Sequence, residues 1–328
     1  MNNITGHTGL TALLGSPVAH SISPLMHNES FRLLGLDYVY LCFDVNEETL
    51  PAAVAGLKTC GIRGFNLTMP NKNKIVELLD ELSPEAQLIG AVNTVLNDNG
   101  KLIGYNTDGY GFMQSVRDAG HDITGKNITV MGVGGASMAI CAQSALDGAA
   151  SVHIFAGRTS RYWNRTQKFA ENLSAKTGCQ VCLFDNDDHT ALRDSIAQSY
   201  LLINATSVGM VPDIDDTIIK DTSLFHPELV VADVVYEPQE TRLLREAKAA
   251  GCQTFNACIC FFIRGLKLSR SGPDRKCRFL LLRKNISLSN SDSHNSHIFP
   301  ISLSLMIARI SLGIYIRSLH ERYLEGMG

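Results

Sequence analysis

The chain has 328 residues, of which 45 % are hydrophobic and 19 % charged, and its formal net charge is -3. This length accommodates two domains that each bury a core. The near-neutral charge argues against the basic surface that nucleic-acid binding needs. The first residues contain neither a charged stretch nor a long apolar stretch, so we expect no export signal and a cytoplasmic location.

The N-terminal part alternates strand and helix patterns, which predicts an α/β domain. An Asn-Gly pair at Asn99-Gly100 lies between two apolar runs and is typical of a tight hairpin. The expected strands are residues 10–14, 38–43, 64–67, 92–96 and 102–105, and the expected helices are residues 26–34 and 50–60.

From Gly109 onward the sequence predicts a series of strand–helix units. The strands are short and apolar throughout, as expected for a parallel sheet that helices cover on both faces. They are expected at residues 128–131, 152–155, 181–184, 201–203 and 230–232.

A glycine-rich segment, Gly132-Val133-Gly134-Gly135-Ala136-Ser137, follows the first of these strands and precedes a helical stretch. Glycines let the backbone approach a pyrophosphate, and a helix N-terminus offers N–H groups to it. This context satisfies the condition for a dinucleotide fingerprint. A tight turn without a ligand is the alternative. We predict a Rossmann dinucleotide-binding domain over residues 108–256, with cofactor contacts from Gly132, Gly134, Gly135, Ala136 and Ser137.

The turn after the second of these strands indicates which dinucleotide binds. It reads Ala156-Gly157-Arg158-Thr159-Ser160-Arg161, and no acidic residue follows before Glu171. An acidic residue there would favour NAD, whereas arginine suits the 2′-phosphate of NADP. We therefore expect NADP, with NAD as the alternative, and contacts from Arg158, Thr159 and Arg161. A solvated basic turn without a ligand remains open.

Two sequence motifs in the N-terminal part suggest the chemistry. Asn66-Leu67-Thr68-Met69-Pro70-Asn71 is followed by Lys72, and Gly104-Tyr105-Asn106-Thr107-Asp108-Gly109 contains an aspartate. Oxidation of a secondary alcohol requires removal of its proton as the hydride leaves, and a Lys–Asp pair that shares the hydroxyl can act as that acid/base. We predict that Lys72 and Asp108 are catalytic, without a metal. On their own, the two residues would read as a surface ion pair.

Several polar residues suit a small polyhydroxylated acid. Ser21 and Ser23 place two hydroxyls on one side of an extended segment, which suits a carboxylate, although Ser23 with Pro24 also reads as the start of a helix. Asn66, Thr68 and Asn93 would supply uncharged hydrogen bonds to the ring. Tyr236 would close the site or lie in the core.

Taken together, these words resemble the shikimate dehydrogenase family. His-Ser-x-Ser-Pro, Asn-x-Thr-x-Pro-x-Lys, Gly-Ala-Val-Asn-Thr, Tyr-Asn-Thr-Asp-Gly, Gly-x-Gly-Gly-Ala and Asn-x-Thr-x-x-Gly-Met occur in the family's order over residues 8–256. The resemblance implies reversible, NADP-dependent reduction of 3-dehydroshikimate to shikimate in aromatic amino acid biosynthesis, by way of chorismate. It implies that Lys72 and Asp108 are the catalytic pair and adds Thr206 to the cofactor contacts. It implies substrate contacts from Ser21, Ser23, Thr68, Asn93 and Asp108.

The resemblance leaves alternatives open. Thr68-Met69-Pro70-Asn71-Lys72 is closer to the quinate/shikimate dehydrogenase branch, which also accepts quinate and uses NAD. The turn at Gly157-Arg158 departs from the family's usual Asn-Arg. A catalytically dead dinucleotide-binding protein or pseudogene product is the non-enzyme alternative. Partners are expected to be small molecules, with no nucleic acid and no membrane, and a homodimer is left open.

Residues 257–328 do not resemble the family, which ends with a helix of the form Gly-x-x-Met-Leu-x-x-Gln-Gly-Ala-x-x-Phe. One permitted codon set for residues 256–272, with a single G inserted after the Asn256 codon, reads Asn-Gly-Leu-His-Met-Leu-Leu-Tyr-Gln-Gly-Ala-Glu-Ala-Phe-Lys-Val-Trp. We therefore predict an out-of-frame tail. Loss of the helix would expose apolar surface, so we expect weak or absent activity from the chain as written.

Overall fold

The computed structural model describes residues 4–21, 23–235 and 237–256. These residues form two compact units, the first containing residues up to 86 together with 90–105, and the second residues 87–89 and those from 106 onward. Tyr236 and the tail 257–328, on which two expectations from the sequence fall, lie outside the described residues.

The first unit is built on a six-stranded mixed sheet with the strand order β2-β1-β3-β5-β6-β4. β1 runs parallel to β2 and β3, whereas β5 runs antiparallel to β3 and β6. The elements are β1 (Gly9–Gly15), α1 (Ser23–Leu34), β2 (Tyr38–Asp44), α2 (Leu50–Thr59), β3 (Gly64–Leu67), the 3-10 helix η1 (Lys74–Leu78), β4 (Glu81–Leu82), α3 (Pro84–Ile89), β5 (Thr94–Asp98) and β6 (Lys101–Tyr105).

The predicted hairpin is confirmed between β5 and β6. Asn99 and Gly100 have φ angles of 51° and 93°, which are the positive values that a two-residue hairpin turn of this kind requires. The short strand β4 was not predicted, because two residues are too few to show an alternating pattern.

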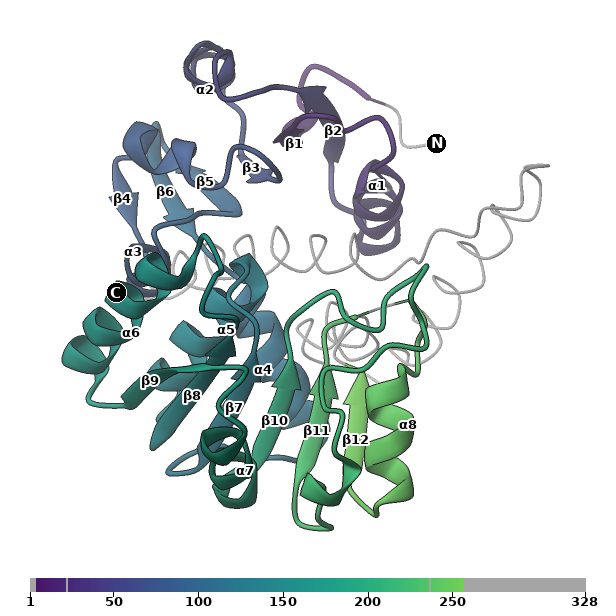
Figure 1. The fold of residues 1–328 in the computed structure, drawn as a ribbon. Helices are drawn as coiled ribbons and strands as arrows, with labels where there is room; N and C mark the ends of the chain where they lie inside the picture. Colours follow the sequence, from purple (N-terminus) through teal and green to yellow (C-terminus); the bar gives the residue numbers. More distant parts are fainter. Residues whose placement is uncertain (1–3, 22, 236, 257–328) are drawn as a thin grey trace, which may run out of the picture. The chain divides into compact units, whose positions relative to one another are not determined.

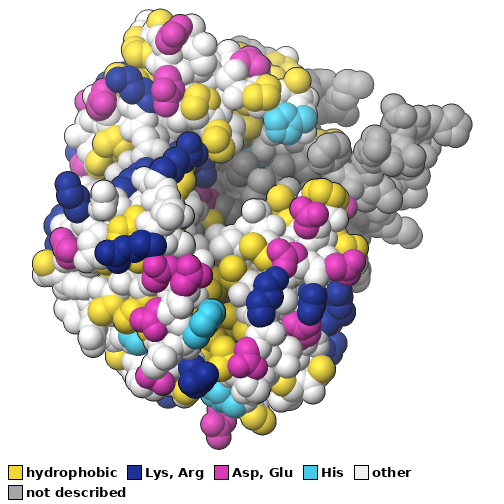
Figure 2. Space-filling view, in the orientation of Figure 1, with side chains coloured by type: hydrophobic (Ala, Val, Ile, Leu, Met, Phe, Trp, Pro, Cys, Tyr) yellow, Lys and Arg dark blue, Asp and Glu magenta, His cyan; other side chains and the backbone are white. Residues whose placement is uncertain are grey.

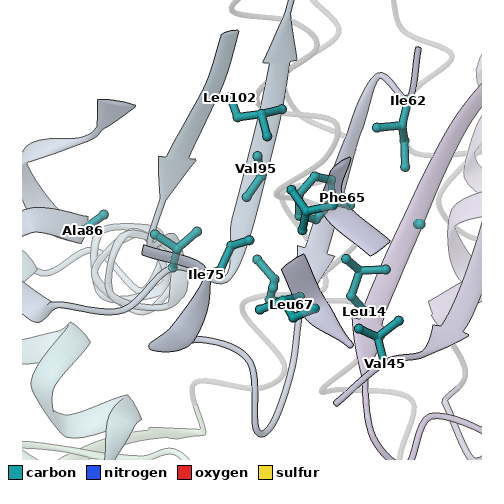
Figure 3. Close-up of a cluster of buried hydrophobic side chains, with 13 residues drawn as sticks. Leu14, Val45, Ile62, Phe65, Leu67, Ile75, Ala86, Val95 and Leu102 are labelled. Atoms are coloured by element: carbon teal, nitrogen blue, oxygen red, sulfur yellow. The ribbon is translucent and has the colours of Figure 1, made fainter. Parts of the chain in front are cut away.

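The core of the first unit follows from the alternation of side chains along its strands. Leu14 of β1 and Phe65 and Leu67 of β3 point into the same apolar cluster as Val95 and Leu102 of the hairpin (Figure 3). Leu13 and Tyr40 belong instead to a second buried cluster, together with Val18 and Phe31. β1 is therefore buried on both faces, which explains its continuous apolar run.

The second unit confirms the predicted parallel sheet, with the strand order β12-β11-β10-β7-β8-β9. α7 lies on one face of the sheet and α4 and α5 on the other (Figure 1). The elements are α4 (Asp108–Asp118), β7 (Asn127–Met131), α5 (Gly135–Leu146), β8 (Ser151–Ala156), α6 (Trp163–Thr177), β9 (Gln180–Asp185), α7 (His189–Gln198), β10 (Leu201–Asn204), the 3-10 helix η2 (Thr222–Leu224), β11 (Val230–Asp233), α8 (Arg242–Ala249) and β12 (Gln253–Asn256).

The topology of this sheet fixes where a ligand can bind. The chain goes outward from the central β7 to β8 and β9, and then returns to β10 on the other side of β7. In open α/β sheets, the crevice outside the carboxyl ends of the strands at such a reversal is the usual ligand site. The glycine loop Gly132–Ser137 begins at this end of β7.

On the face drawn in Figure 2, the basic and acidic side chains of the described residues are interspersed, and neither charge dominates. Within the same residues, none of the helices combines the length and the apolar character needed to cross a bilayer.

Candidate active site

The loop after β3 holds Lys72 in place by main-chain hydrogen bonds. The Thr68 N–H donates to the Leu14 carbonyl at 3.0 Å, and the Val92 N–H donates to the Lys72 carbonyl at 2.8 Å. The fully buried Asn71 side chain adds a bond from Nδ2 to the Val45 carbonyl at 2.7 Å. The Lys72 main chain is therefore hydrogen-bonded to Val92, the residue that precedes Asn93.

Asn66 and Asn93, both predicted from the sequence to contact substrate, belong to one buried hydrogen-bond network. Asn66 Nδ2 donates to Thr94 Oγ1 at 3.0 Å and to the Asn93 carbonyl at 3.3 Å. Thr94 Oγ1 donates to Asn93 Oδ1 at 3.0 Å, and Tyr40 Oη donates to Asn66 Oδ1 at 2.8 Å. Because a tyrosine hydroxyl here meets an amide oxygen, the network sets which end of the Asn66 amide faces β2.

His27 supports this network from α1. Its ring stacks on that of Tyr40, with centroids 3.9 Å apart and planes within 4°. The side chain is 1 % exposed, and burial lowers its pKa to about 3, so the ring is neutral. His27 Nε2 finds no hydrogen-bond partner among the described residues. Neither His27 nor Tyr40 was predicted from the sequence, because their contact depends on how α1 packs on β2.

The two serines are placed differently from each other. The Ser23 N–H donates to Ser21 Oγ at 3.2 Å, and α1 begins at Ser23. Ser23 is fully buried, and its Oγ has no hydrogen-bond partner within the described part of the chain. The start of α1 at Ser23 confirms that Ser23 with Pro24 marks the start of a helix, but the Ser23 hydroxyl makes no capping hydrogen bond. A buried, unbonded hydroxyl at a helix N-terminus is instead suited to a ligand that brings its own acceptor.

The glycine loop of the second unit fits a dinucleotide. Gly132 has φ 110°, and a Cβ there would lie 2.8 Å from Thr206 Cγ2, so packing requires this glycine. A Cβ at Gly134 or Gly135 would meet nothing within 4 Å. These two glycines therefore leave open space at the N-terminus of α5, where N–H groups suit a pyrophosphate. Ser137 is buried, and its Oγ donates to the Gly132 carbonyl at 2.6 Å, which closes the loop on itself.

The predicted phosphate-binding residues follow β8. Arg158, Thr159 and Arg161 are all exposed in the turn before α6. Neither guanidinium forms an ion pair with a described acidic residue, unlike Arg117, which pairs with Asp147 at 2.6 Å. Arg161 Nη2 donates to Tyr162 Oη at 2.6 Å, and the other N–H donors of the two arginines can take an anion. The residues present fit NADP as the cofactor.

Thr206 is held in the loop after β10 by a second polar network. Its Oγ1 donates to Asn204 Oδ1 at 2.7 Å, and Asn204 Nδ2 donates to both oxygens of Asp233 at 3.1 and 3.2 Å. Thr241 Oγ1 also donates to Asp233, at 2.7 Å. Burial raises the pKa of the Asp233 carboxyl to about 6, although the hydrogen bonds oppose this shift. The network ties the loops after β10 and β11 together beside Gly132.

The structure distributes the predicted residues over both units. Ser21, Ser23, Asn66, Thr68, Lys72 and Asn93 lie in the first unit. Asp108 is the first residue of α4 in the second unit, and its N–H donates to Asn106 Oδ1 at 3.3 Å. Within the described ranges, no cluster of His, Cys, Asp and Glu is arranged to hold a metal ion.

A separate cavity of about 470 Å³ lies beside β8, β9 and α7 and contains none of the predicted site residues. His153 and Ser195 line it and share a hydrogen bond of 2.9 Å between Nδ1 and Oγ. Asp188, at its rim, caps α7 by accepting from the Ala191 N–H at 2.9 Å. We assign this cavity no part in the candidate active site.

Known proteins resemble the chain over both units. Residues 13–95 match the shikimate dehydrogenase substrate binding domain. A shikimate dehydrogenase (NADP(+)) from Listeria innocua is 48 % identical over 264 residues, which are 80 % of this chain and 90 % of the relative. The crystal structure of shikimate 5-dehydrogenase from Listeria monocytogenes, in complex with shikimate and NAD, has a TM-score of 0.80 and 44 % identity, covering 87 % of this chain and 99 % of that one.

A quinate dehydrogenase from Corynebacterium glutamicum, in complex with NAD, has a TM-score of 0.68 and 26 % identity, covering 93 % of this chain and 99 % of that one. A substrate-binding α/β unit joined to a Rossmann unit defines a nicotinamide-dependent oxidoreductase that acts on a CH–OH group and takes a small-molecule substrate. The chain belongs to the shikimate dehydrogenase family. The Listeria innocua relative is named for NADP(+), and the Listeria monocytogenes structure contains NAD.

Proposed function

We propose that the chain catalyses the reversible, NADP-dependent reduction of 3-dehydroshikimate to shikimate. The observation that carries this proposal is the 48 % identity to a shikimate dehydrogenase (NADP(+)), combined with the hydrogen bonds that bring Asn66, Asn93 and the Lys72 loop together. The proposal places the chain in chorismate and aromatic amino acid biosynthesis.

In the proposed reaction, Lys72 and Asp108 act on one substrate hydroxyl. When bound, NADP supplies the hydride acceptor or donor. Lys72 Nζ carries three donors on a flexible stem and can pass a proton to or from that hydroxyl, while the Asp108 carboxylate accepts its hydrogen bond and orients it. The bonds from Val92 and Asn71 restrict the Lys72 loop, so less freedom is lost when substrate binds.

The other predicted residues receive binding roles. Ser21 and Ser23 would bind the carboxylate, Asn66, Thr68 and Asn93 the ring hydroxyls, and Tyr236 would close the site. Gly132, Gly134, Gly135, Ala136 and Ser137 would form the pyrophosphate loop, and Thr206 would flank it. Arg158, Thr159 and Arg161 would bind the 2′-phosphate.

We further propose a substrate domain over residues 1–107, a cofactor domain over 108–256 and an out-of-frame tail over 257–328. A cytoplasmic location rests on the unpaired state of the described cysteines. A homodimer is proposed for test by light scattering.

Sequencing the gene across the codons for residues 255–265 tests the tail. An extra G would show that the tail comes from a sequencing error. The sequence as given would mean that the gene itself carries the frameshift.

The test of function is steady-state turnover by the chain as written and by a frame-restored chain. Shikimate and quinate are each combined with NADP⁺ and NAD⁺, and the absorbance of reduced cofactor is followed. We expect the highest kcat/KM for shikimate with NADP⁺, and a weaker rate from the chain as written. Preference for quinate with NAD⁺ would favour the activity named for the Corynebacterium neighbour. Cofactor binding without turnover in either chain would contradict both.

A further inference from the structure

Each arginine in the turn after β8 is backed by its own aromatic ring. Arg158 Cζ lies 4.7 Å from the centroid of the Trp163 ring, and Arg161 Cζ lies 4.7 Å from that of Tyr162. Arg161 Nη2 also donates to Tyr162 Oη at 2.6 Å. The sequence-based prediction included the arginines and missed both rings.

The turn itself is folded so that these stacks can form. The Ser160 N–H donates to the Gly157 carbonyl and the Trp163 N–H to the Ser160 carbonyl, both at 2.9 Å. Trp163 is the first residue of α6, and it is only partly exposed, whereas Arg158 is exposed. The rigid end of the helix therefore carries the ring, and the mobile side chain lies against it.

Stacking by itself uses none of an arginine's N–H donors, although Arg161 also donates one, from Nη2, to Tyr162 Oη. A free arginine side chain has about 2 kcal/mol of rotamer entropy, part of which is lost on binding. A guanidinium held over an indole ring has lost some of that freedom already, and its N–H donors stay available to a phosphate. Arg158 makes no ion pair with a described acidic residue, so its fork is not taken up within the described part of the chain.

We propose that Trp163, and to a smaller extent Tyr162, are positioning residues that give this chain its preference for NADP over NAD. They do so by holding Arg158 and Arg161 ready for the 2′-phosphate, the group that NAD lacks. The inference rests on the cofactor part of the proposed function and requires no assumption about the substrate.

The test is calorimetric binding of NADP⁺ and NAD⁺ to the full chain. We expect Trp163→Leu to raise the Kd for NADP⁺ by roughly fivefold to tenfold, the range of one cation–π contact, and to leave the Kd for NAD⁺ within about twofold. Trp163→Phe, which keeps a ring, should restore most of the NADP⁺ affinity. On an Arg158→Gln background, Trp163→Leu should have no further effect on NADP⁺, because it acts through that arginine.

A matched control lies at the opposite end of the sheet. Lys126 Nζ lies 5.5 Å from the centroid of the Tyr200 ring. Tyr200→Leu removes this cation–π pair, together with the 2.9 Å hydrogen bond between Tyr200 Oη and His121 Nδ1, without touching the turn. We expect it to leave both dissociation constants unchanged. Tyr162→Leu provides a second variant at an exposed position, where loss of folding is not expected, and should weaken NADP⁺ about twofold to fivefold.

Three outcomes would overturn the inference: an unchanged NADP⁺ affinity in Trp163→Leu and Tyr162→Leu, an equal loss for NADP⁺ and NAD⁺, or a native chain that does not prefer NADP⁺. The binding assay contains no substrate. A shifted cofactor preference in a chain that does not turn over shikimate would therefore support the inference while contradicting the proposed reaction.

The chain also provides an internal probe, because Trp163 is its one tryptophan. Saturating NADP⁺ should change the tryptophan emission, and Arg158→Gln should remove most of that change. Unchanged emission at a concentration that calorimetry shows to be saturating would contradict the placement of the phosphate beside Trp163.

Discussion

The two units build their candidate binding sites by different means. In the first unit the residues expected to contact substrate would do so through side chains, and other side chains hold them in place. Tyr40 and Thr94 form hydrogen bonds with Asn66, and Thr94 forms another with Asn93. In the second unit the glycine loop offers backbone N–H groups, and the shape of the loop is set by close packing at Gly132. Specificity for a ring with several hydroxyls needs directed side chains, whereas a pyrophosphate needs only room and N–H groups.

The largest expected effect is on Lys72. In the frame-restored chain, Lys72→Ala should lower kcat for shikimate by about 10²- to 10⁴-fold, because it removes the acid/base group. The Kd for NADP⁺ should not change. Lys74 is the matched control, since it lies two positions away and pairs with Glu77 at 2.8 Å on the surface. If Lys74→Ala and Lys72→Ala reduce kcat equally, the assignment of Lys72 is wrong.

The next effect concerns acid stability. The ordinary pKa of histidine is 6.5, and burial lowers that of His27 to about 3. Below pH 6.5 the imidazole is protonated in the unfolded chain, whereas in the folded chain it stays neutral down to about pH 3. The free energy of unfolding is therefore unaffected by this group above pH 6.5 and decreases as the pH falls, by about 3 kcal/mol at pH 4.

Urea unfolding of wild type and His27→Leu from pH 7 to pH 4 checks this linkage. The variant should lose about 3 kcal/mol less than wild type over that range. His189→Gln, at an exposed position at the start of α7, serves as the control. Parallel pH dependences for wild type and His27→Leu would show that His27 is not the acid-sensitive group.

A third prediction separates the two kinds of glycine. Gly132→Ala should lower the free energy of unfolding by about 2 kcal/mol, because φ is 110° and the new Cβ would meet Thr206 and the Ala205 carbonyl. Gly134→Ala should leave the free energy of unfolding unchanged, since φ is −78° and a Cβ would meet open space. It should, however, weaken the binding of NADP⁺. Thermal unfolding and calorimetry measure the two quantities. Equal stability of both variants would refute the distinction.

The smallest expected effect tests the side-chain network of the first unit. Tyr40→Phe removes one hydrogen bond and Thr94→Val removes two. Each variant should lower kcat/KM for shikimate about fivefold or more, at about 1 kcal/mol per hydrogen bond. Thr11→Val removes a comparable bond from Oγ1 to the Val39 carbonyl, at 3.0 Å in the same sheet. Steady-state kinetics on all three variants should show no loss for Thr11→Val. A similar loss in all three would mean that the network serves folding alone.

Much of the fold was predictable because it depends on local patterns. The hairpin follows from Asn99-Gly100, and the parallel strands follow from short apolar runs. β12 was missed because Gln253 and Thr254 make it partly polar and it has only four residues. The start of α1 at Ser23 agrees with the Ser23-Pro24 pattern, although the helical periodicity is clear only from Met26.

The contacts that support the site were harder to predict. Tyr40 meets Asn66 only because β1 lies between β2 and β3, and the register across three strands is not written in any one segment. Ser23 was expected at the start of a helix and α1 does begin there, but the hydrogen bond from the Ser23 N–H to Ser21 Oγ was not predicted. Trp163 was not singled out from the sequence, because its role depends on a contact with Arg158, five positions earlier, that the sequence pattern does not show.

The most direct test of the account is a crystal structure of the frame-restored chain with NADP⁺ and shikimate. The account predicts that one shikimate hydroxyl lies within about 3.2 Å of both Lys72 Nζ and an Asp108 carboxylate oxygen, with the ring contacting Asn66 and Asn93. It also predicts the pyrophosphate at Gly134 and Gly135 and the 2′-phosphate at Arg158. Shikimate bound away from Lys72, or a cofactor bound away from the glycine loop, would contradict it.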